Sequence, residues 1–297
     1  MVNMLLSSNI TTWESLGSIV EKYSVPLRPG AETDFSDSIF GAWFVSPAHH
    51  AFEFVTFAPL WISACLFFAW RAFGSHTKAF KMLTTFQPPY PPSPTEIGLL
   101  VALTVSFVVT VIHKIASNTV MFLLQPCHVS AGLLIAVMMW PDKRSPIPHL
   151  LLNVYLHTAW GAIAALLFPD LRDHEMLGEV TNFFVEHGLI LIAPAYLLYS
   201  KRYVVMPASL DMALFSFFLY AFYHCPVLQI LALRTAYNLN YVLVPPSLTI
   251  LIELGPWYRI TMYTIALISM MVTRFILFGL YLAVMPEKRL SKKEKSL

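Results

Sequence analysis

The sequence predicts an all-α membrane protein in which about seven transmembrane helices pack in one bundle. Of its 297 residues, 57% are hydrophobic and only 12% are charged, whereas about a quarter of the residues in ordinary soluble domains are charged. Apolar runs of the length that crosses a bilayer, about 17 to 25 residues, recur along the chain. The connections between these runs are short. No connection is long enough to form a soluble domain.

The chain divides into three parts. Residues 1–47 form a polar and mixed N-terminal segment, residues 48–286 the transmembrane domain, and residues 287–297 a basic tail. The N-terminal segment lacks a basic stretch followed by a short apolar run, so we expect no cleavable signal peptide and insertion by the first span. The expected spans lie near residues 51–70, 97–113, 118–139, 147–168, 183–199, 210–232 and 261–285. Prolines in the connection 76–96 favour extended, solvated backbone.

The basic residues predict the orientation of the bundle, because Lys and Arg are retained on the cytoplasmic side. With seven spans, the side that holds the C-terminus carries twelve of them and the opposite side six. We therefore expect a lumenal N-terminus and a cytoplasmic C-terminus. A glycosylation sequon at Asn9 is compatible with this orientation. Lys293 and Lys295 resemble a dilysine retrieval signal, which predicts an endoplasmic reticulum or Golgi membrane. A basic tail at anionic headgroups is the alternative reading.

Ionisable side chains inside spans are costly and usually face the bundle interior, so they are candidates for function. The candidates are Cys127, His128, His157, His187 and His224. At about 1.5 Å per residue, the spans place Cys127, His157 and His224 roughly 12 to 17 Å below the lumenal surface and His187 about 6 Å below it. These depths are compatible with one layer in the lumenal half. Arg274 lies deeper and is interpreted as structural.

The segment Gln125-Pro126-Cys127-His128 interrupts an apolar run. We expect Pro126 to kink the helix, and backbone that loses its partners there is tolerated beside a polar cavity. A thiol becomes a good nucleophile when a base takes its proton. Because adjacent helical residues point about 100° apart, the base for Cys127 is expected from another helix and not from His128.

Plainer interpretations exist for each of these residues. A cysteine in a span is often a packing residue, which is how we interpret Cys65 and Cys225. A buried histidine often bonds only a backbone carbonyl. His49, His50 and Glu53 have metal-ligand chemistry, but a wet helix start explains them more simply. A net charge of +2 without a basic stripe or phosphate loop argues against a nucleic-acid partner.

Three segments carry a resemblance to a known family. Residues 118–134, 222–240 and 255–260, which read "NTVMFLLQPCHVSAGLL", "FYHCPVLQILALRTAYNLN" and "GPWYRI", resemble the transmembrane protein 164 family. That family is known as cysteine-dependent acyltransferases that make arachidonoyl ether phospholipids, and it is distantly similar to the androgen-induced gene 1 hydrolases. The similarity runs through most of residues 96–285. Gln125 departs from it, because the family has Asn at this position.

The resemblance implies site residues. The family's nucleophile falls on Cys127 and its catalytic histidine on His187, while His128, His157 and His224 match further polar positions with supporting roles. The implied reaction is phospholipid O-acyl transfer through a Cys127 thioester, with His187 as the base in both half-reactions, His128 secondary to it, and no metal or other cofactor. The partners would be a donor phospholipid and a lysophospholipid acceptor in the membrane.

Headgroup contacts and the reaction class remain open at this stage. Polar residues at or near the lumenal ends are candidates to contact the headgroup: Gln229, Asn238, Asn240, Tyr258 and Arg259. The guanidinium of Arg259 suits a phosphate. A hydrolase, in which water resolves the thioester, is the first alternative. A seven-helix transporter or receptor that uses the histidines for protons or ligand is the second.

Overall fold

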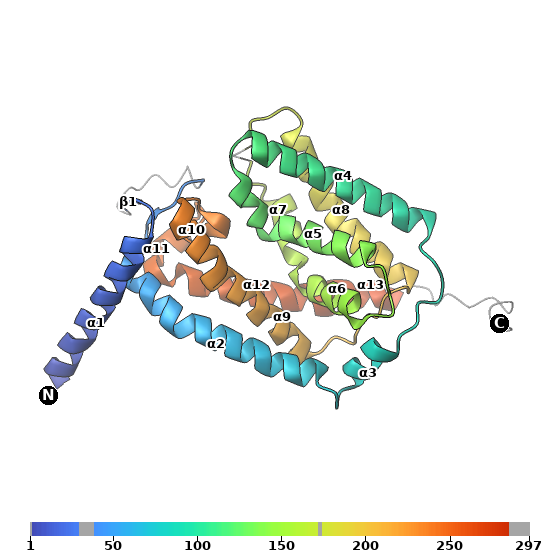
Figure 1. The fold of residues 1–297 in the computed structure, drawn as a ribbon, viewed down its shortest axis with the longest axis horizontal. Coiled ribbons are helices and arrows are strands. Elements are labelled where there is room, and N and C mark those ends of the chain that lie inside the picture. The colour runs from blue at the N-terminus through green and yellow to red at the C-terminus, as the bar shows by residue number, and fades with distance from the viewer. Residues whose placement is uncertain (1, 30–38, 172–173, 285–297) are drawn as a thin grey trace.

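A computed structural model describes residues 2–29, 39–171 and 174–284. The side chains of residues 2–11, among them the Asn9 sequon, and the dilysine-like tail lie outside the described part of the chain. The fold is an all-α bundle, as the sequence predicts, with strand limited to one short parallel pair, β1 (Arg28–Pro29) and β2 (Ala42–Trp43), in the described residues (Figure 1).

Six stretches of helix in the described chain are long and apolar enough to cross a membrane. They confirm a multi-pass membrane protein. The stretches are α2 (Pro47–Phe73), α4 (Pro94–Ala116), α6 (Pro146–Thr158) with α7 (Trp160–Leu167), α8 (Glu179–Ser200), α9 (Leu210–Phe222) with α10 (Gln229–Thr235), and the segment Gly255–Val284, which contains α12 (Tyr258–Met271) and α13 (Phe278–Val284).

The expected third span, residues 118–139, is wrong in its length. Residues Val120–Leu124 form a short 3₁₀ helix, and α5 begins at Pro126 and ends at Met139. Its 14 residues rise only about 21 Å, less than the roughly 30 Å of hydrocarbon. The count of seven full spans is therefore not confirmed. In Figure 1, α5 still lies between α4 and α6 and runs antiparallel to both.

Pro126 begins a helix and does not kink one, contrary to the sequence-based expectation. A proline pushes the preceding residue out of the helical region, and Gln125 is extended, with φ −63° and ψ 145°. The ring also fixes a helical φ and lacks only an N–H that has no partner in the first turn, which suits the first position of a helix. Cys127 consequently lies at the start of α5, not midway along a span.

Helices outside the predicted spans complete the fold. The segment before the first span contains α1 (Val2–Tyr23), which projects from the bundle in Figure 1 and meets α2 where Gly17 lies against Pro47 and Ala48. A Cβ at Gly17 would lie 2.7 Å from the backbone nitrogen of Ala48, so this crossing requires glycine. The proline-rich connection contains α3 (Lys78–Thr85) before it becomes extended. A five-residue helix, α11 (Thr249–Glu253), precedes α12.

One hydrophobic core cluster packs α5 against α8. Leu103 of α4, Leu134 of α5, Leu152 of α6 and Ile190 of α8 are fully buried in it. Each such leucine or isoleucine removed from its packing typically costs about 2–5 kcal/mol. This packing positions the first turn of α5 beside the first half of α8, where the candidate site lies.

Candidate active site

A cavity of about 90 Å³ lies at the end of the bundle where α4 ends and α5 and α8 begin. It brings together Cys127, His128 and His187 from two helices. The other lining residues come from α4, from α8, from the 3₁₀ helix before α5, from a second 3₁₀ helix (Leu239–Tyr241), and from loops: Ile39, Lys114, Phe122, Gln125, Asp170, His174, Phe183, Asn238, Asn240 and Tyr241. The predicted nucleophile and the predicted base thus line one cavity.

Cys127 is the second residue of α5, directly after Pro126. The N–H groups of the first turn of a helix have no partner within the helix. In α5 the side chain of the N-cap residue, Gln125, does not accept a hydrogen bond from them. These N–H groups and the helix dipole favour negative charge near the helix start. A thiolate at Cys127, or an oxyanion formed from a substrate carbonyl beside it, would be stabilised by the backbone of α5.

His187 has one ring nitrogen tied and the other without a partner. Its Nδ1 lies 2.7 Å from the carbonyl oxygen of Phe183, one turn earlier in α8. A carbonyl oxygen only accepts hydrogen bonds, so Nδ1 carries the hydrogen. Nε2 is buried and has no hydrogen-bond partner. The ring of Phe183 packs against the imidazole, with centroids 4.1 Å apart. His187 is therefore held with a basic nitrogen unoccupied.

His128 is held differently, by a buried carboxylate. Its Nδ1 lies 2.7 Å from Oε1 of Glu186, whose exposed fraction is 1%. The other carboxylate oxygen of Glu186 accepts a hydrogen bond from Thr110. Asn182 donates to the Thr110 hydroxyl at 2.8 Å and accepts from Ser106 at 2.9 Å. A chain of hydrogen bonds between α4 and α8 thus fixes the carboxylate that orients His128.

Comparison with known proteins identifies the family. The model of the TMEM164 family matches residues 44–275, which is more than three quarters of the chain. The chain belongs to the TMEM164 family. It is 29% identical over 210 residues to "Transmembrane protein 164 homolog" from Dictyostelium discoideum, a match that covers 69% of this chain and 74% of that protein. No solved structure matches the chain.

Two histidines assigned supporting roles lie outside the cavity of this TMEM164 family member. His157 of α6 bonds the carbonyl of Asn153, and its Nε2 is buried without a partner. His224 lies between the hydroxyl of Tyr263 and the backbone carbonyl of Asn240, each at 3.0 Å. His224 thus supports the loop that forms one wall of the cavity. Of the four residues expected to lie at a similar depth, only Cys127 and His187 line the cavity.

Asn238 and Asn240 line the cavity, but both also organise their own loop. Asn238 accepts hydrogen bonds from the backbone nitrogens of Leu243 and Val244 at 3.0 and 3.1 Å. Asn240 has a left-handed backbone, with φ 49°, and donates to the hydroxyl of Tyr220 at 3.2 Å. These contacts shape the wall that faces Cys127.

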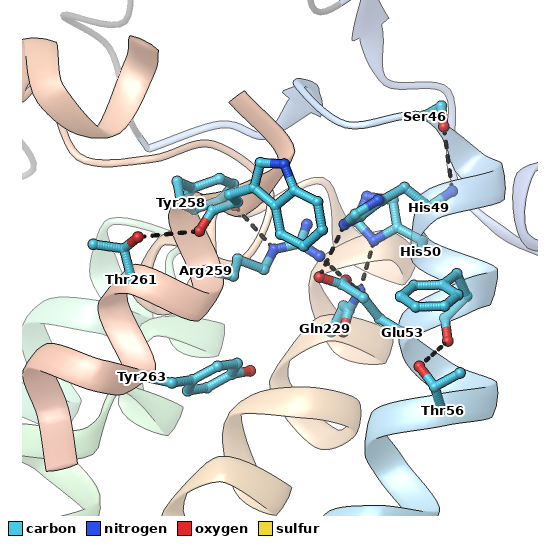
Figure 2. Close-up of polar contacts among 12 residues, drawn as sticks. Ser46, His49, His50, Glu53, Thr56, Gln229, Tyr258, Arg259, Thr261 and Tyr263 are labelled. Carbon is cyan, nitrogen blue, oxygen red and sulfur yellow. Dashed lines mark hydrogen bonds and ion pairs between the residues drawn. The ribbon is translucent and has the colours of Figure 1, made fainter. Parts of the chain in front are cut away.

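Gln229, Tyr258 and Arg259 do not line the cavity. They belong to a buried cluster at the start of α2, shown in Figure 2. Arg259 forms an ion pair with Glu53 and donates from Nε to the Tyr258 hydroxyl at 3.1 Å. Gln229 donates to Glu53 at 2.9 Å and lies 2.7 Å from Nδ1 of His50. The guanidinium that suited a lipid phosphate is thus already paired with a carboxylate.

Glu53 and Arg259 tie α2 to α12, and replacing either one is expected to destabilise the bundle. Arg259→Ala leaves a buried carboxylate without its cation, which typically costs about 3–5 kcal/mol. The double variant Glu53→Gln, Arg259→Met removes both charges and is expected to lose less stability than Arg259→Ala. Thermal unfolding in detergent measures the difference. Equal stability of wild type and Arg259→Ala would contradict the role of this pair.

Glu186 is the site residue that the sequence reasoning missed. It directly precedes His187 inside a span, where a carboxylate is as costly as an imidazole, so its position was a signal in itself. Its partner His128 lies 58 residues earlier, a contact that needs the packing of α5 on α8.

Arg274 donates to the backbone carbonyl of Met206, a structural contact. No cluster of three or more His, Cys, Asp or Glu suited to a metal is present among the residues described.

Proposed function

We propose that this protein is a membrane-embedded thiol acyltransferase that moves a fatty acyl chain from a donor phospholipid to a lysophospholipid, the latter an ether lipid by resemblance. The observation that carries the proposal is that Cys127, on the first turn of α5, and His187, whose Nε2 has no hydrogen-bond partner, line the same cavity. Membership of the TMEM164 family supports it.

In the first half-reaction, the thiol proton of Cys127 passes to a base and the sulfur attacks the ester carbonyl of the donor. The unoccupied Nε2 of His187 qualifies His187 as that base. The tetrahedral intermediate carries an oxyanion, which the N–H groups at the start of α5 are positioned to stabilise. Collapse breaks the ester C–O bond, leaves the acyl group on sulfur, and releases a lysophospholipid whose oxygen takes up a proton.

In the second half-reaction, the acceptor hydroxyl loses its proton and its oxygen attacks the thioester carbonyl. The C–S bond breaks, the new ester forms, and the sulfur regains a proton. The sum is an exchange of one acyl chain between two alcohols, without net oxidation or hydrolysis. Both substrates are lipids of the bilayer that surrounds the bundle.

The basic-residue count and the dilysine-like tail support a location in the endoplasmic reticulum or Golgi membrane, with the cavity toward the lumenal side. The start of α2 and the start of α5, whose first turn lines the cavity, lie at the same end of the bundle in Figure 1. Antibody access to tagged termini in selectively permeabilised cells tests this orientation. A C-terminal tag reached only from the lumen would contradict it.

A product assay tests the function and separates it from the hydrolase and transporter alternatives. Purified protein in liposomes receives a donor phospholipid with a labelled acyl chain and an ether lysophospholipid. The proposal predicts labelled ether phospholipid as the main product. Labelled free fatty acid in its place would indicate a hydrolase. Proton-coupled flux without any lipid product would indicate a transporter. Cys65→Ala, a cysteine that does not line the cavity, is the matched control and is expected to retain activity.

A further inference from the structure

We propose that Glu186 holds His128 as a second proton-transfer group, which serves the lipid hydroxyl while His187 serves the thiol. The inference rests on the proposed function, in which Cys127 is the nucleophile. It adds a division of labour between two histidines and assigns Glu186 as a positioning residue. The single-base scheme, in which His187 serves both half-reactions, is the alternative.

The geometry leaves His128 only one nitrogen for chemistry. Its Nδ1 is engaged by the carboxylate of Glu186 at 2.7 Å, and a carboxylate accepts, so Nδ1 donates. His128 lines the cavity, so Nε2 is the ring nitrogen left to face a substrate there. Thr110 occupies the second oxygen of Glu186, and the carboxylate is buried to 1% exposure. Glu186 is thus immobilised beside the imidazole, and it does not itself line the larger cavity.

The two histidines differ in what holds them, and this difference suits them to opposite roles. A carboxylate partner favours an imidazolium, because the hydrogen bond then joins two opposite charges. A neutral carbonyl, such as that of Phe183 behind His187, gives no such charge pairing. In the proposed cycle, His128 therefore acts first as the acid, through Nε2, and His187 acts first as the base, through its own Nε2.

The surrounding charges support this assignment. A smaller adjoining cavity is lined by both histidines and by the ionisable residues His113, Lys114, His174, Glu179 and Glu186. Lys114 and Glu179 form an ion pair at 3.2 Å, each with an exposed fraction of 3%. The charges of Lys114 and Glu179 therefore balance each other. Glu186 takes no part in that pair, and its carboxylate contacts His128.

Two histidines in these roles complete the proton balance of both half-reactions. When Cys127 attacks the donor, the thiol proton moves to Nε2 of His187, and Nε2 of His128 gives its proton to the leaving lipid oxygen as the ester C–O bond breaks. The states of the two rings are now exchanged. When the acceptor attacks the thioester, its hydroxyl proton moves to His128, and His187 returns its proton to the departing sulfur as the C–S bond breaks. Both rings then hold the protons with which the cycle began.

The experiment separates the two proton transfers in the full-length protein. Cys127 is loaded with a long-chain p-nitrophenyl ester, whose good leaving group needs no acid. The thioester is then discharged either by lysophospholipid, an alcohol that needs a base, or by hydroxylamine, a nucleophile that needs none. Intact-protein mass spectrometry follows the loss of the acyl group. The variant is Glu186→Gln, which removes the charge and keeps the shape of the side chain.

The proposal predicts that Glu186→Gln loads and reacts with hydroxylamine at the wild-type rate but transfers to lysophospholipid at least about 10-fold more slowly, because the carboxylate behind a catalytic histidine sets its orientation and charge. His128→Ala should share this pattern, with a loss of about 10²-fold or more. Glu96→Gln, which removes a buried carboxylate of α4 that pairs with Arg202 and lines neither cavity, should leave the ratio of the two discharge rates unchanged.

Two results would overturn the role of Glu186 while leaving the acyltransferase intact. The first is discharge of the Glu186→Gln thioester to lysophospholipid at the wild-type rate. The second is an equal slowing of loading, hydroxylamine discharge and lipid transfer, which indicates a purely structural role. A wild-type protein that never loads at Cys127 would instead refute the nucleophile, and the inference with it.

Discussion

Replacing His187 with alanine is expected to slow acyl transfer by about 10²–10⁴-fold, the usual contribution of a general base. The variant keeps the thiol and the backbone N–H groups of α5 but loses the nitrogen that takes the thiol proton. Loading of Cys127 by an activated ester should fall by the same factor, because that step also begins with removal of the thiol proton. Single-turnover loading in detergent micelles measures it.

His157 provides the matched control for His187. Both are buried histidines whose Nδ1 bonds the carbonyl four residues earlier and whose Nε2 has no partner, but only His187 lines the cavity. The folded fraction of His157→Ala is therefore expected to load at the wild-type rate. If His157→Ala loses loading while His187→Ala retains it, the base comes from α6 and not from α8, and the assignment of His187 is wrong.

Replacing Cys127 with alanine is expected to remove acyl transfer altogether, down to the background rate without enzyme. No other thiol takes its place, because neither Cys65 nor Cys225 lines the cavity. Cys127→Ala also removes little volume from a partly buried position, so the bundle should fold and express normally. Transfer of labelled acyl chains in liposomes, normalised to folded protein, provides the measurement. Near-normal transfer by Cys127→Ala would refute the mechanism.

The helical architecture could be predicted from sequence because hydropathy records a property of each segment alone. Six of the predicted spans match stretches of helix long and apolar enough to cross a membrane. The remaining expected span, residues 118–139, is wrong because the apolar run continues through Pro126 while a new helix begins there. Hydropathy does not register that proline suits the first position of a helix, although this preference was available from the residue type.

The candidate site was predictable only in part, because the sequence does not show which side chains meet when the helices pack. Cys127 and His187 could be proposed as a pair by resemblance and by the cost of polar groups in spans, and the packing of α5 on α8 places both at one cavity. The partners of polar residues could not be predicted. Arg259 was expected at a lipid headgroup, yet its guanidinium meets Glu53, 206 residues earlier. Glu186 and His128 likewise meet only when two helices pack.

The central claim is that the acyl chain passes through a thioester on Cys127, and one measurement tests it most directly. Wild-type protein is incubated with a donor phospholipid in the absence of acceptor, quenched in acid, digested and analysed by mass spectrometry. We predict a mass increase equal to one acyl group on the peptide that contains Cys127, removable by neutral hydroxylamine and discharged by added lysophospholipid. An unmodified Cys127 in protein that is transferring acyl chains, or an acyl group on another residue, would contradict the account.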